Sequence, residues 1–193
     1  MSYHHGNLRA ALLAAGREIL EFEGVGGVGL RRVARQVGVS HTAPYRHFQD
    51  VNELLASLAA QGFDELGNGF TAAAMSAGSG LDLLRRGGRA YVEFGLANPA
   101  MFRLMFTHHD PAMFEILRPS YEAAHAGFVA VVESAVAEGS VSTTDSDAAA
   151  AVAWSVVHGL VLLVIEGHLD VPPDPDLVIG LALDGIARRP AGS

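Results

Sequence analysis

Five polar side chains lie close together between residues 41 and 47, and each can hydrogen-bond to the bases or phosphates of nucleic acid. They follow a glycine turn, Gly38-Val39-Ser40, and apolar residues at helical spacing precede that turn. Glycine accepts the left-handed backbone of such a turn, and the small Ala34 lets two helices approach closely. The pattern indicates a helix-turn-helix, in which the second helix enters the major groove of DNA. The five residues are His41, Thr42, Tyr45, Arg46 and His47.

The charge of the chain is unevenly distributed. The net charge of −8 argues against a protein that binds nucleic acid over its whole surface. Residues 1–50 hold six arginines and four acidic residues, whereas residues 51–193 hold seven arginines and seventeen acidic residues. A mildly basic head on an acidic body is typical of a protein that contacts DNA at one end only.

The elements that must position these residues are all helical. Apolar residues recur at helical spacing, with no alternating strand pattern and no internal repeat. We therefore predict an all-α protein of about nine helices, three of which form the helix-turn-helix head. Ser40 is expected to cap the reading helix, and Pro44 to lie in its first turn. The later helices are predicted at about 52–75, 81–96, 100–106, 112–117, 119–137, 145–167 and 174–188.

Composition limits the class of protein. Half of the residues are apolar, so we expect a partner subunit or a ligand to cover part of the apolar surface. The chain has no cysteine, which excludes disulfides and thiolate metal sites. The polar N-terminus predicts no signal peptide. The apolar stretch 148–165 barely reaches membrane-spanning length and contains Trp154 and His158, which favours a buried helix in a soluble cytoplasmic protein.

Longer motifs carry a resemblance to a known family. The runs from Tyr3 to Arg9, Leu30 to Ser40 and Ala43 to Phe48, followed by Glu53-Leu54-Leu55, resemble the start of TetR-family repressors. The run from Asn98 to Phe106 and the sequence Trp154-x3-His158-Gly159 resemble a subgroup whose C-terminal domain has a Trp-x3-His-Gly signature. Together these motifs extend over most of the chain.

This resemblance implies a homodimeric transcriptional regulator without a cofactor. Residues 1–50 would form the DNA-binding domain, and residues 51–193 a ligand-sensing and dimerisation domain. The helices at 145–167 and 174–188 would form a four-helix bundle with those of the partner. A small-molecule effector would move the linking helix and separate the two heads, which must lie about 35 Å apart to bind a near-palindromic double-stranded operator. Repression is the expected action, and activation stays open.

The resemblance also assigns roles within the head. Arg31 matches a position that often reaches a base edge or a phosphate, although a solvated surface arginine is the alternative. The first two residues of the reading helix are candidates for base contacts, and Tyr45 and His47 match a phosphate-contacting pair. Arg46 either reads guanine or binds phosphate, and the sequence leaves both open. The predicted DNA-binding residues are Arg31, Ser40, His41, Thr42, Tyr45, Arg46 and His47.

Two residues of the head depart from the family pattern. Val51 stands where the family usually has a lysine that meets a phosphate, and Gly29 stands where a threonine or serine often caps the second helix. We therefore expect fewer ionic contacts with the operator than the family usually makes.

A second set of residues is a candidate lining for an effector pocket. Aromatic and methionine side chains with a few polar atoms are typical of such pockets, although a plain helical core gives the same spacing. For His158 the alternative is a core histidine that joins two helices. An apolar or aromatic effector is favoured over a sugar or an ion. The residues are Met101, Phe102, Met105, Phe106, Phe114, Tyr121, His125, Phe128, Trp154 and His158.

Three alternatives to a regulator are a metal site, an enzyme and a helical binding module. His108-His109-Asp110 could suggest a metal, but adjacent histidines on a loop point in different directions, and no metal site is expected. An enzyme is disfavoured because the chain has no nucleophile elbow, phosphate loop or recognisable pair of carboxylates. A helical binding module that has kept the head without using it stays an alternative.

Overall fold

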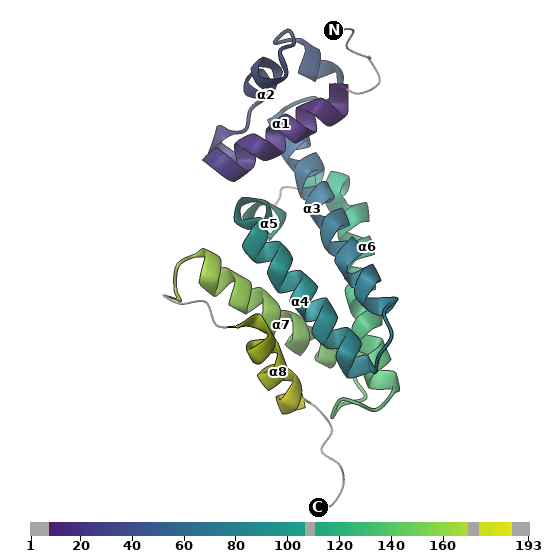
Figure 1. Cartoon of the computed structure of the whole chain (residues 1–193). Helices are drawn as coiled ribbons and strands as arrows, with labels where there is room; N and C mark the ends of the chain where they lie inside the picture. The colour runs from purple at the N-terminus through teal and green to yellow at the C-terminus, as the bar shows by residue number, and fades with distance from the viewer. Residues whose placement is uncertain (1–7, 107–110, 170–173, 187–193) are drawn as a thin grey trace, which may run out of the picture. The chain divides into compact units, whose positions relative to one another are not determined.

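The computed structural model describes residues 8–106, 111–169 and 174–186, and the described residues form helices without any strand (Figure 1). This confirms the predicted all-α class. There are eight α-helices and two short 3-10 helices in this part of the chain. Their bounds are α1 Leu8–Glu23, η1 Val25–Gly27, α2 Leu30–Val37, η2 Ala43–Arg46, α3 Val51–Ala74, α4 Gly80–Ala97, α5 Pro99–Phe106, α6 Pro111–Ala137, α7 Ser146–Ile165 and α8 Pro175–Ile186.

One predicted helix boundary is wrong. The sequence predicted two helices on either side of Arg118, but α6 is continuous from Pro111 to Ala137 with Pro119 inside it. A proline removes one backbone hydrogen bond from a helix interior, which packing on both sides can offset. Leu117 before the proline is 1% exposed and Ala124 after it is 3% exposed, so buried contacts hold the helix on both sides.

The described helices divide into two compact units. The first unit consists of residues 1–63 and 98–121, and the second of residues 64–97 and 122–193. Two of the three boundaries, at 63/64 and 121/122, fall inside helices, so α3 and α6 each contribute residues to both units. The helix-turn-helix therefore shares a compact unit with α5, which is distant in sequence.

The first unit is built on α1, which packs against α2 and α5. One face of α1 is buried from Leu12 to Leu20. Arg9 of α1 lies over the Phe48 ring, 5.2 Å from its centroid, and donates a hydrogen bond to Ser57 of α3 at 3.0 Å. Arg17 donates to the side-chain oxygen of Asn98 at 3.0 Å. These contacts fix the first helix against segments from elsewhere in the chain.

The second unit is built on α4, which packs against α7 and α8 (Figure 1). The helix starts are capped by carboxylates. Asp145 accepts a hydrogen bond from the backbone of Ala148 at 3.0 Å, and Asp174 accepts one from the backbone of Asp176 at 2.9 Å. Carboxylates that accept hydrogen bonds from the first turn in this way are typical N-caps. At the start of α4, hydrogen bonds from Ser79 hold the pKa of Asp82 below its usual value.

Candidate functional site

The turn after α2 has the geometry that the sequence predicted. Gly38 ends α2 in the left-handed conformation, with φ of 79°, which is costly for residues other than glycine. Its N–H is directed at the carbonyl oxygens of Ala34 and Arg35. Leu30, Val33 and Ala34 are buried and hold α2 in the first unit. The exposed side of α2 is therefore fixed relative to the residues after the turn.

The segment after the turn differs from the expected helix. It is a 3-10 helix, Ala43–Arg46, and its N-cap residue Thr42 makes no side-chain capping bond. The Ser40 hydroxyl lies 3.2 Å from the Thr42 hydroxyl, so the prediction that Ser40 caps this helix is wrong. Pro44 has no N–H to donate to the carbonyl of Ser40, and Ala43 donates to that carbonyl instead. Buried Pro44 and Phe48 anchor the segment.

A surface hollow joins the start of α2 to this segment. It has a volume of about 550 Å³, and we call it the head hollow. Arg31 and Arg35 lie one helical turn apart on α2 and both line it, together with Tyr45, which is 53% exposed. Arg32 is paired with Glu23, whereas Arg31 and Arg35 form no ion pair with any residue that the structure describes. Asp50 also lines the hollow, so three arginines face one carboxylate there and the lining has a net positive charge.

The remaining predicted DNA-binding residues lie around the same segment. Ser40, His41, Thr42 and Arg46 are exposed, and His47 is half-buried. The structure therefore brings Arg31 and Tyr45 to one hollow and leaves four of the others open to solvent. Exposed polar side chains on a segment anchored by buried residues are what a base- or phosphate-contacting surface requires.

The head hollow also contains residues that the sequence reasoning did not select. Arg35 and Gln49 line it. Arg35 could have been found from its spacing, because residues four apart share one face of a helix. Gln49 had no such signal, since its position depends on how the chain enters α3. That start is fixed by reciprocal bonds: Glu53 donates its N–H to Asp50 at 3.0 Å and accepts one from Gln49 at 2.7 Å.

The two departures from the family pattern are part of this surface. Gly29 and Val51 both line the head hollow. Gly29 is the N-cap of α2 and supplies no side-chain capping bond. Val51 is the first residue of α3 and contributes an apolar side chain to the hollow.

Six of the predicted pocket residues belong to the first unit, and most of them are closely packed. Met101 and Phe102 are 0% exposed, and Met105 is 3% exposed. The Phe106 ring lies 4.8 Å from that of Phe102 and 5.5 Å from that of Phe63. Tyr121 also lies edge-on to Phe63 at 5.4 Å, and Phe114, 37% exposed, lies 6.0 Å from Tyr121.

The other four predicted pocket residues belong to the second unit and differ in their exposure and contacts. His125 is exposed on α6, and Phe128 packs on Phe70 at 5.6 Å. Trp154 and His158 lie one turn apart on α7 and both reach the Tyr91 hydroxyl of α4. Trp154 Nε1 donates to it at 3.1 Å, and His158 Nδ1 lies 2.7 Å from it. We call Tyr91, Trp154 and His158 the Tyr91 cluster.

In the Tyr91 cluster, the geometry and the burial favour a neutral imidazole ring at His158. The indole N–H is only a donor, so the Tyr91 oxygen accepts from it and can give its own proton to Nδ1 of His158. Burial lowers the pKa of His158, which favours the neutral ring. Burial also raises the pKa of Tyr91, so its proton stays on the oxygen. Sequence reasoning named Trp154 and His158 but missed Tyr91, to which both bind.

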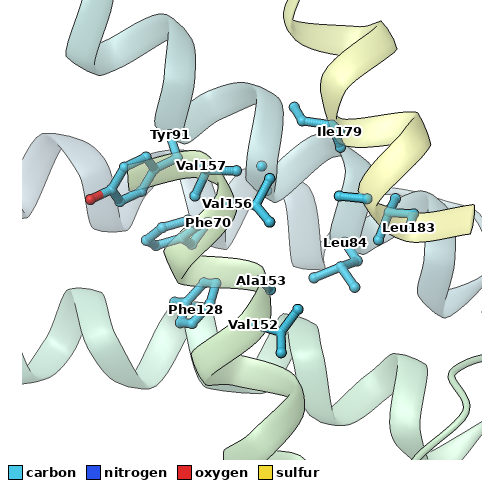
Figure 2. Close-up of a pocket in the computed structure, with 13 residues that line it drawn as sticks. Phe70, Leu84, Tyr91, Phe128, Val152, Ala153, Val156, Val157, Ile179 and Leu183 are labelled. Atoms are coloured by element: carbon cyan, nitrogen blue, oxygen red, sulfur yellow. The ribbon is translucent and has the colours of Figure 1, made fainter. Parts of the chain in front are cut away.

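A cavity lies beside this cluster in the second unit (Figure 2). We call it the second-unit cavity. Its walls come from α3, α4, α6, α7 and α8, and Phe128 is the one predicted pocket residue among them. The lining residues are Phe70, Leu84, Gly87, Gly88, Tyr91, Phe128, Val152, Ala153, Val156, Val157, Ile179, Ala182 and Leu183.

No metal site is found in the part of the chain that the structure describes. No group of three or more histidine, aspartate or glutamate side chains there is arranged to hold an ion. The candidate segment His108-His109-Asp110 lies outside the described residues.

Comparison with known families places the chain among regulators. The family model described as bacterial regulatory proteins of the tetR family matches residues 12–58, and that of the tetracyclin repressor-like C-terminal domain matches residues 84–186. Those matches cover the helix-turn-helix and more than half of the chain. The protein therefore belongs to the TetR family. It is a transcription regulator with a DNA-binding head and a ligand-binding C-terminal domain, and not an enzyme.

Solved structures agree with this assignment. A protein of unknown function from Rhodococcus sp. RHA1 is 35% identical, with a TM-score of 0.85 over 97% of this chain and 100% of that one. A tetR-family regulatory protein from Rhodococcus RHA1 is 22% identical, with a TM-score of 0.71 over 92% of this chain and 96% of that one. A putative transcriptional regulator from Pseudomonas aeruginosa PAO1 is 19% identical, with a TM-score of 0.75 over 95% and 91%. The last two show the fold alone. A comparison with curated proteins finds no match.

Proposed function

We propose that this regulator is a cytoplasmic repressor that binds a near-palindromic operator as a dimer and is released by a small apolar molecule. Residues 1–50 would bind DNA, and residues 51–193 would sense the effector and dimerise. The head hollow carries this proposal, because Arg31 and Arg35 present charge there without a carboxylate partner in the described residues. Charge without an internal partner beside a helix-turn-helix matches a surface that binds phosphates.

Within this proposal, different residues of the head contact different parts of the operator. Arg31 and Tyr45 are assigned to the phosphates or base edges that flank the head hollow, and half-buried His47 to a phosphate. His41 and Thr42 come first in the exposed segment and are the candidates for base contacts. Exposed Arg46 either reads guanine or binds phosphate, and Ser40 contributes a hydroxyl at the edge of the surface.

The dimer is supported by an apolar face on the last two helices. By length and composition, α7 could cross a membrane, with a mean hydropathy of 2.3, and only 22% of that window is buried. TetR-family regulators are soluble DNA-binding proteins, so we assign the uncovered side to a second copy of this chain. Leu163 of α7 is 45% exposed, and Leu177 and Leu181 of α8 are 60% and 65% exposed. A four-helix bundle through 145–167 and 174–188 would cover them.

Two regions of the protein are candidates for the effector site. The aromatic cluster of the first unit and the Tyr91 cluster with Phe128 of the second unit each contain residues expected to line a pocket. Trp154, His158 and Gly159 also form the signature of the Trp-x3-His-Gly subgroup, to which we assign this chain.

Operator binding is tested with DNA from upstream of the protein's own gene. We expect a gel shift by the wild-type protein and a loss of at least tenfold in affinity for Arg35→Glu, which places negative charge in the head hollow. Arg118→Glu is the control, because Arg118 is exposed on α6 and already paired with Glu115. A failure of the wild type to shift any upstream fragment would favour the rival, a helical binding module. A shift that raises transcription would make the protein an activator.

The dimer is tested by analytical ultracentrifugation. The double variant Leu177→Asp/Leu181→Asp should sediment as a monomer and lose operator binding, because a dimer must place two heads on one site. Met75→Asp is the matched control: Met75 is also an exposed apolar residue, at 83%, but it lies outside α7 and α8. A double variant that remains dimeric would contradict the assignment of this face.

A further inference from the structure

The segment that carries the candidate DNA-binding residues depends on its neighbours for its orientation. Its 3-10 helix, Ala43–Arg46, is a single turn, and we call it the reading segment. So short a helix has few internal hydrogen bonds, and their geometry is poorer than in an α-helix. The backbone N–H groups of His47 and Phe48 both donate to the carbonyl of Pro44, at 2.9 and 3.0 Å, and close its end. Phe48 is 1% exposed, so the way in which its ring is held sets the direction of the reading segment.

Arg9 of α1 contacts this buried ring. Its guanidinium carbon lies 5.2 Å from the centroid of the Phe48 ring, within the range of a cation–π contact. The same guanidinium donates a hydrogen bond from Nη2 to the Ser57 hydroxyl of α3 at 3.0 Å. One side chain of α1 thus joins the end of the reading segment to α3. We call Arg9, Phe48 and Ser57 the Arg9 bridge.

The α3 end of the Arg9 bridge is itself fixed. Ser57 is 5% exposed, and its hydroxyl donates to the carbonyl of Glu53 at 2.8 Å. Glu53 in turn closes the first turn of α3 through its reciprocal hydrogen bonds. The chain between Phe48 and Ser57 is therefore held at both ends by one guanidinium. Because α3 continues into the second unit, the Arg9 bridge ties the reading segment to the helix that the two units share.

Two observations favour a positioning role for Arg9 over a direct contact with phosphate. Arg9 is not among the residues that line the head hollow, where Arg31, Arg32 and Arg35 lie. The groups that bind its guanidinium, a ring and a hydroxyl, belong to residues that are 1% and 5% exposed. The guanidinium is therefore directed at buried groups of the first unit.

We propose that Arg9 is a positioning residue for operator binding, which orients the reading segment on α3 without touching the DNA. The inference rests on the proposed operator-binding function and adds a residue that this function did not use. Without the Arg9 bridge, Phe48 stays buried but loses the contact that fixes the direction of its ring. The side chains of the reading segment would then meet the major groove in a wider range of orientations, and the affinity would fall.

The first test is operator affinity, measured by fluorescence anisotropy on a labelled upstream fragment that the wild type shifts. Arg9→Met removes both contacts, and we expect a loss of about threefold for each head and about tenfold for the dimer, which places two heads on one operator. Arg9→Lys keeps a cation over the Phe48 ring and should bind within threefold of the wild type. Arg118→Met is the matched control, because Arg118 is an exposed arginine of the same unit, and it should bind like the wild type.

A double variant separates positioning from direct contact with DNA. Ser57 is buried, so Ser57→Ala can weaken operator binding only through the Arg9 bridge. In the Arg9→Met background the same change should have no further effect, because the bond that it removes is already absent. Arg9→Met should also keep the salt slope of the wild type, whereas loss of a phosphate contact would flatten it by about 0.9 per subunit. Additive losses or a flatter slope would make Arg9 a phosphate contact and overturn the proposal.

Amide exchange supplies a readout that a general loss of stability would not reproduce. In Arg9→Met the N–H of Phe48 should exchange faster, while that of Val33, bonded to the Gly29 carbonyl at 2.9 Å, should keep its rate. Equal acceleration at both amides would make Arg9 a general stabilising residue and overturn the proposal. Faster exchange at Phe48 alone, in a protein that shifts no upstream DNA, would overturn the proposed function and leave the Arg9 bridge standing. Equal operator affinities of the wild type and Arg9→Met would overturn the inference and leave the regulator standing.

Discussion

The head and the second unit place their candidate functional groups in opposite surroundings. In the head, Arg31, His41 and Arg46 are exposed, and buried residues such as Val33 and Phe48 only hold the segments that carry them. In the second unit, Tyr91 is 3% exposed and is at once a core residue, a cavity wall and a hydrogen-bonding centre. Function can therefore be removed from the head without unfolding it, whereas a change in the second unit affects packing and site together.

The first prediction tests whether the aromatic cluster serves packing. Phe102 is 0% exposed, and we expect Phe102→Ala to lower the free energy of unfolding by about 3–5 kcal/mol through cavity formation. Because Phe102 shares the first unit with the helix-turn-helix, amide exchange in α1 should accelerate as well. Urea unfolding measures the first effect. Phe22→Ala, at 89% exposure, is the control and should change stability by less than about 0.5 kcal/mol. A small loss for Phe102→Ala would mean that the cluster is not a packed core.

The second prediction separates function from stability in the head. Arg31→Ala should weaken operator binding by about 1–3 kcal/mol and leave urea unfolding unchanged, because the side chain is exposed. Fluorescence anisotropy with labelled operator measures the affinity. Arg118→Ala is the control. Unchanged operator affinity in Arg31→Ala would remove the head hollow from the DNA-binding surface.

The same contrast explains which features of the fold and of the site could be predicted from the sequence. The head was predictable because its signals are local: Gly38 after a short helix, and exposed polar residues within seven positions. The shape of the reading segment was missed, because the missing N–H of Pro44 and the burial of Phe48 act through tertiary packing. The Tyr91 cluster joins residues more than 60 positions apart, and no periodicity connects them. The helical spacing that suggested one pocket is shared by plain core residues, and only the structure assigns them to two units.

The third prediction tests the hydroxyl at the centre of the second unit. Tyr91→Phe should lower the free energy of unfolding by about 1 kcal/mol, because Trp154 and His158 each lose a hydrogen-bond partner. Tyr45→Phe is the control, since Tyr45 is 53% exposed and its hydroxyl can reach water. Thermal unfolding followed by circular dichroism compares the two. Equal effects would contradict the contrast between an exposed head and a buried site.

The fourth prediction concerns the pH dependence of stability. Burial lowers the pKa of His158 below the value of about 6.5 that it has in the unfolded chain. Between the pKa of His158 in the folded state and its pKa in the unfolded state, the unfolded chain binds more protons than the folded protein. The free energy of unfolding is therefore highest above about pH 6.5 and falls as the pH drops towards the folded pKa. His158→Gln should remove this part of the pH dependence, and His168→Gln, at an exposed position, should keep it. Urea unfolding between pH 5 and 8 measures both. Unfolding curves of His158→Gln that follow the wild type at every pH would exclude His158 as the source.

The last prediction concerns the contribution of ionic contacts to operator binding by the head. Val51 lines the head hollow beside Arg31 and Arg35, so a lysine there would add a cation to charge that already lacks a carboxylate partner in the described residues. Val51→Lys should steepen the plot of log affinity against log salt by about 0.9 per subunit. Met75→Lys adds the same charge on an exposed residue of the second unit and should leave the slope unchanged. An unchanged slope in Val51→Lys would place the start of α3 away from the phosphates, and the operator would then be held by α2 and the exposed segment alone.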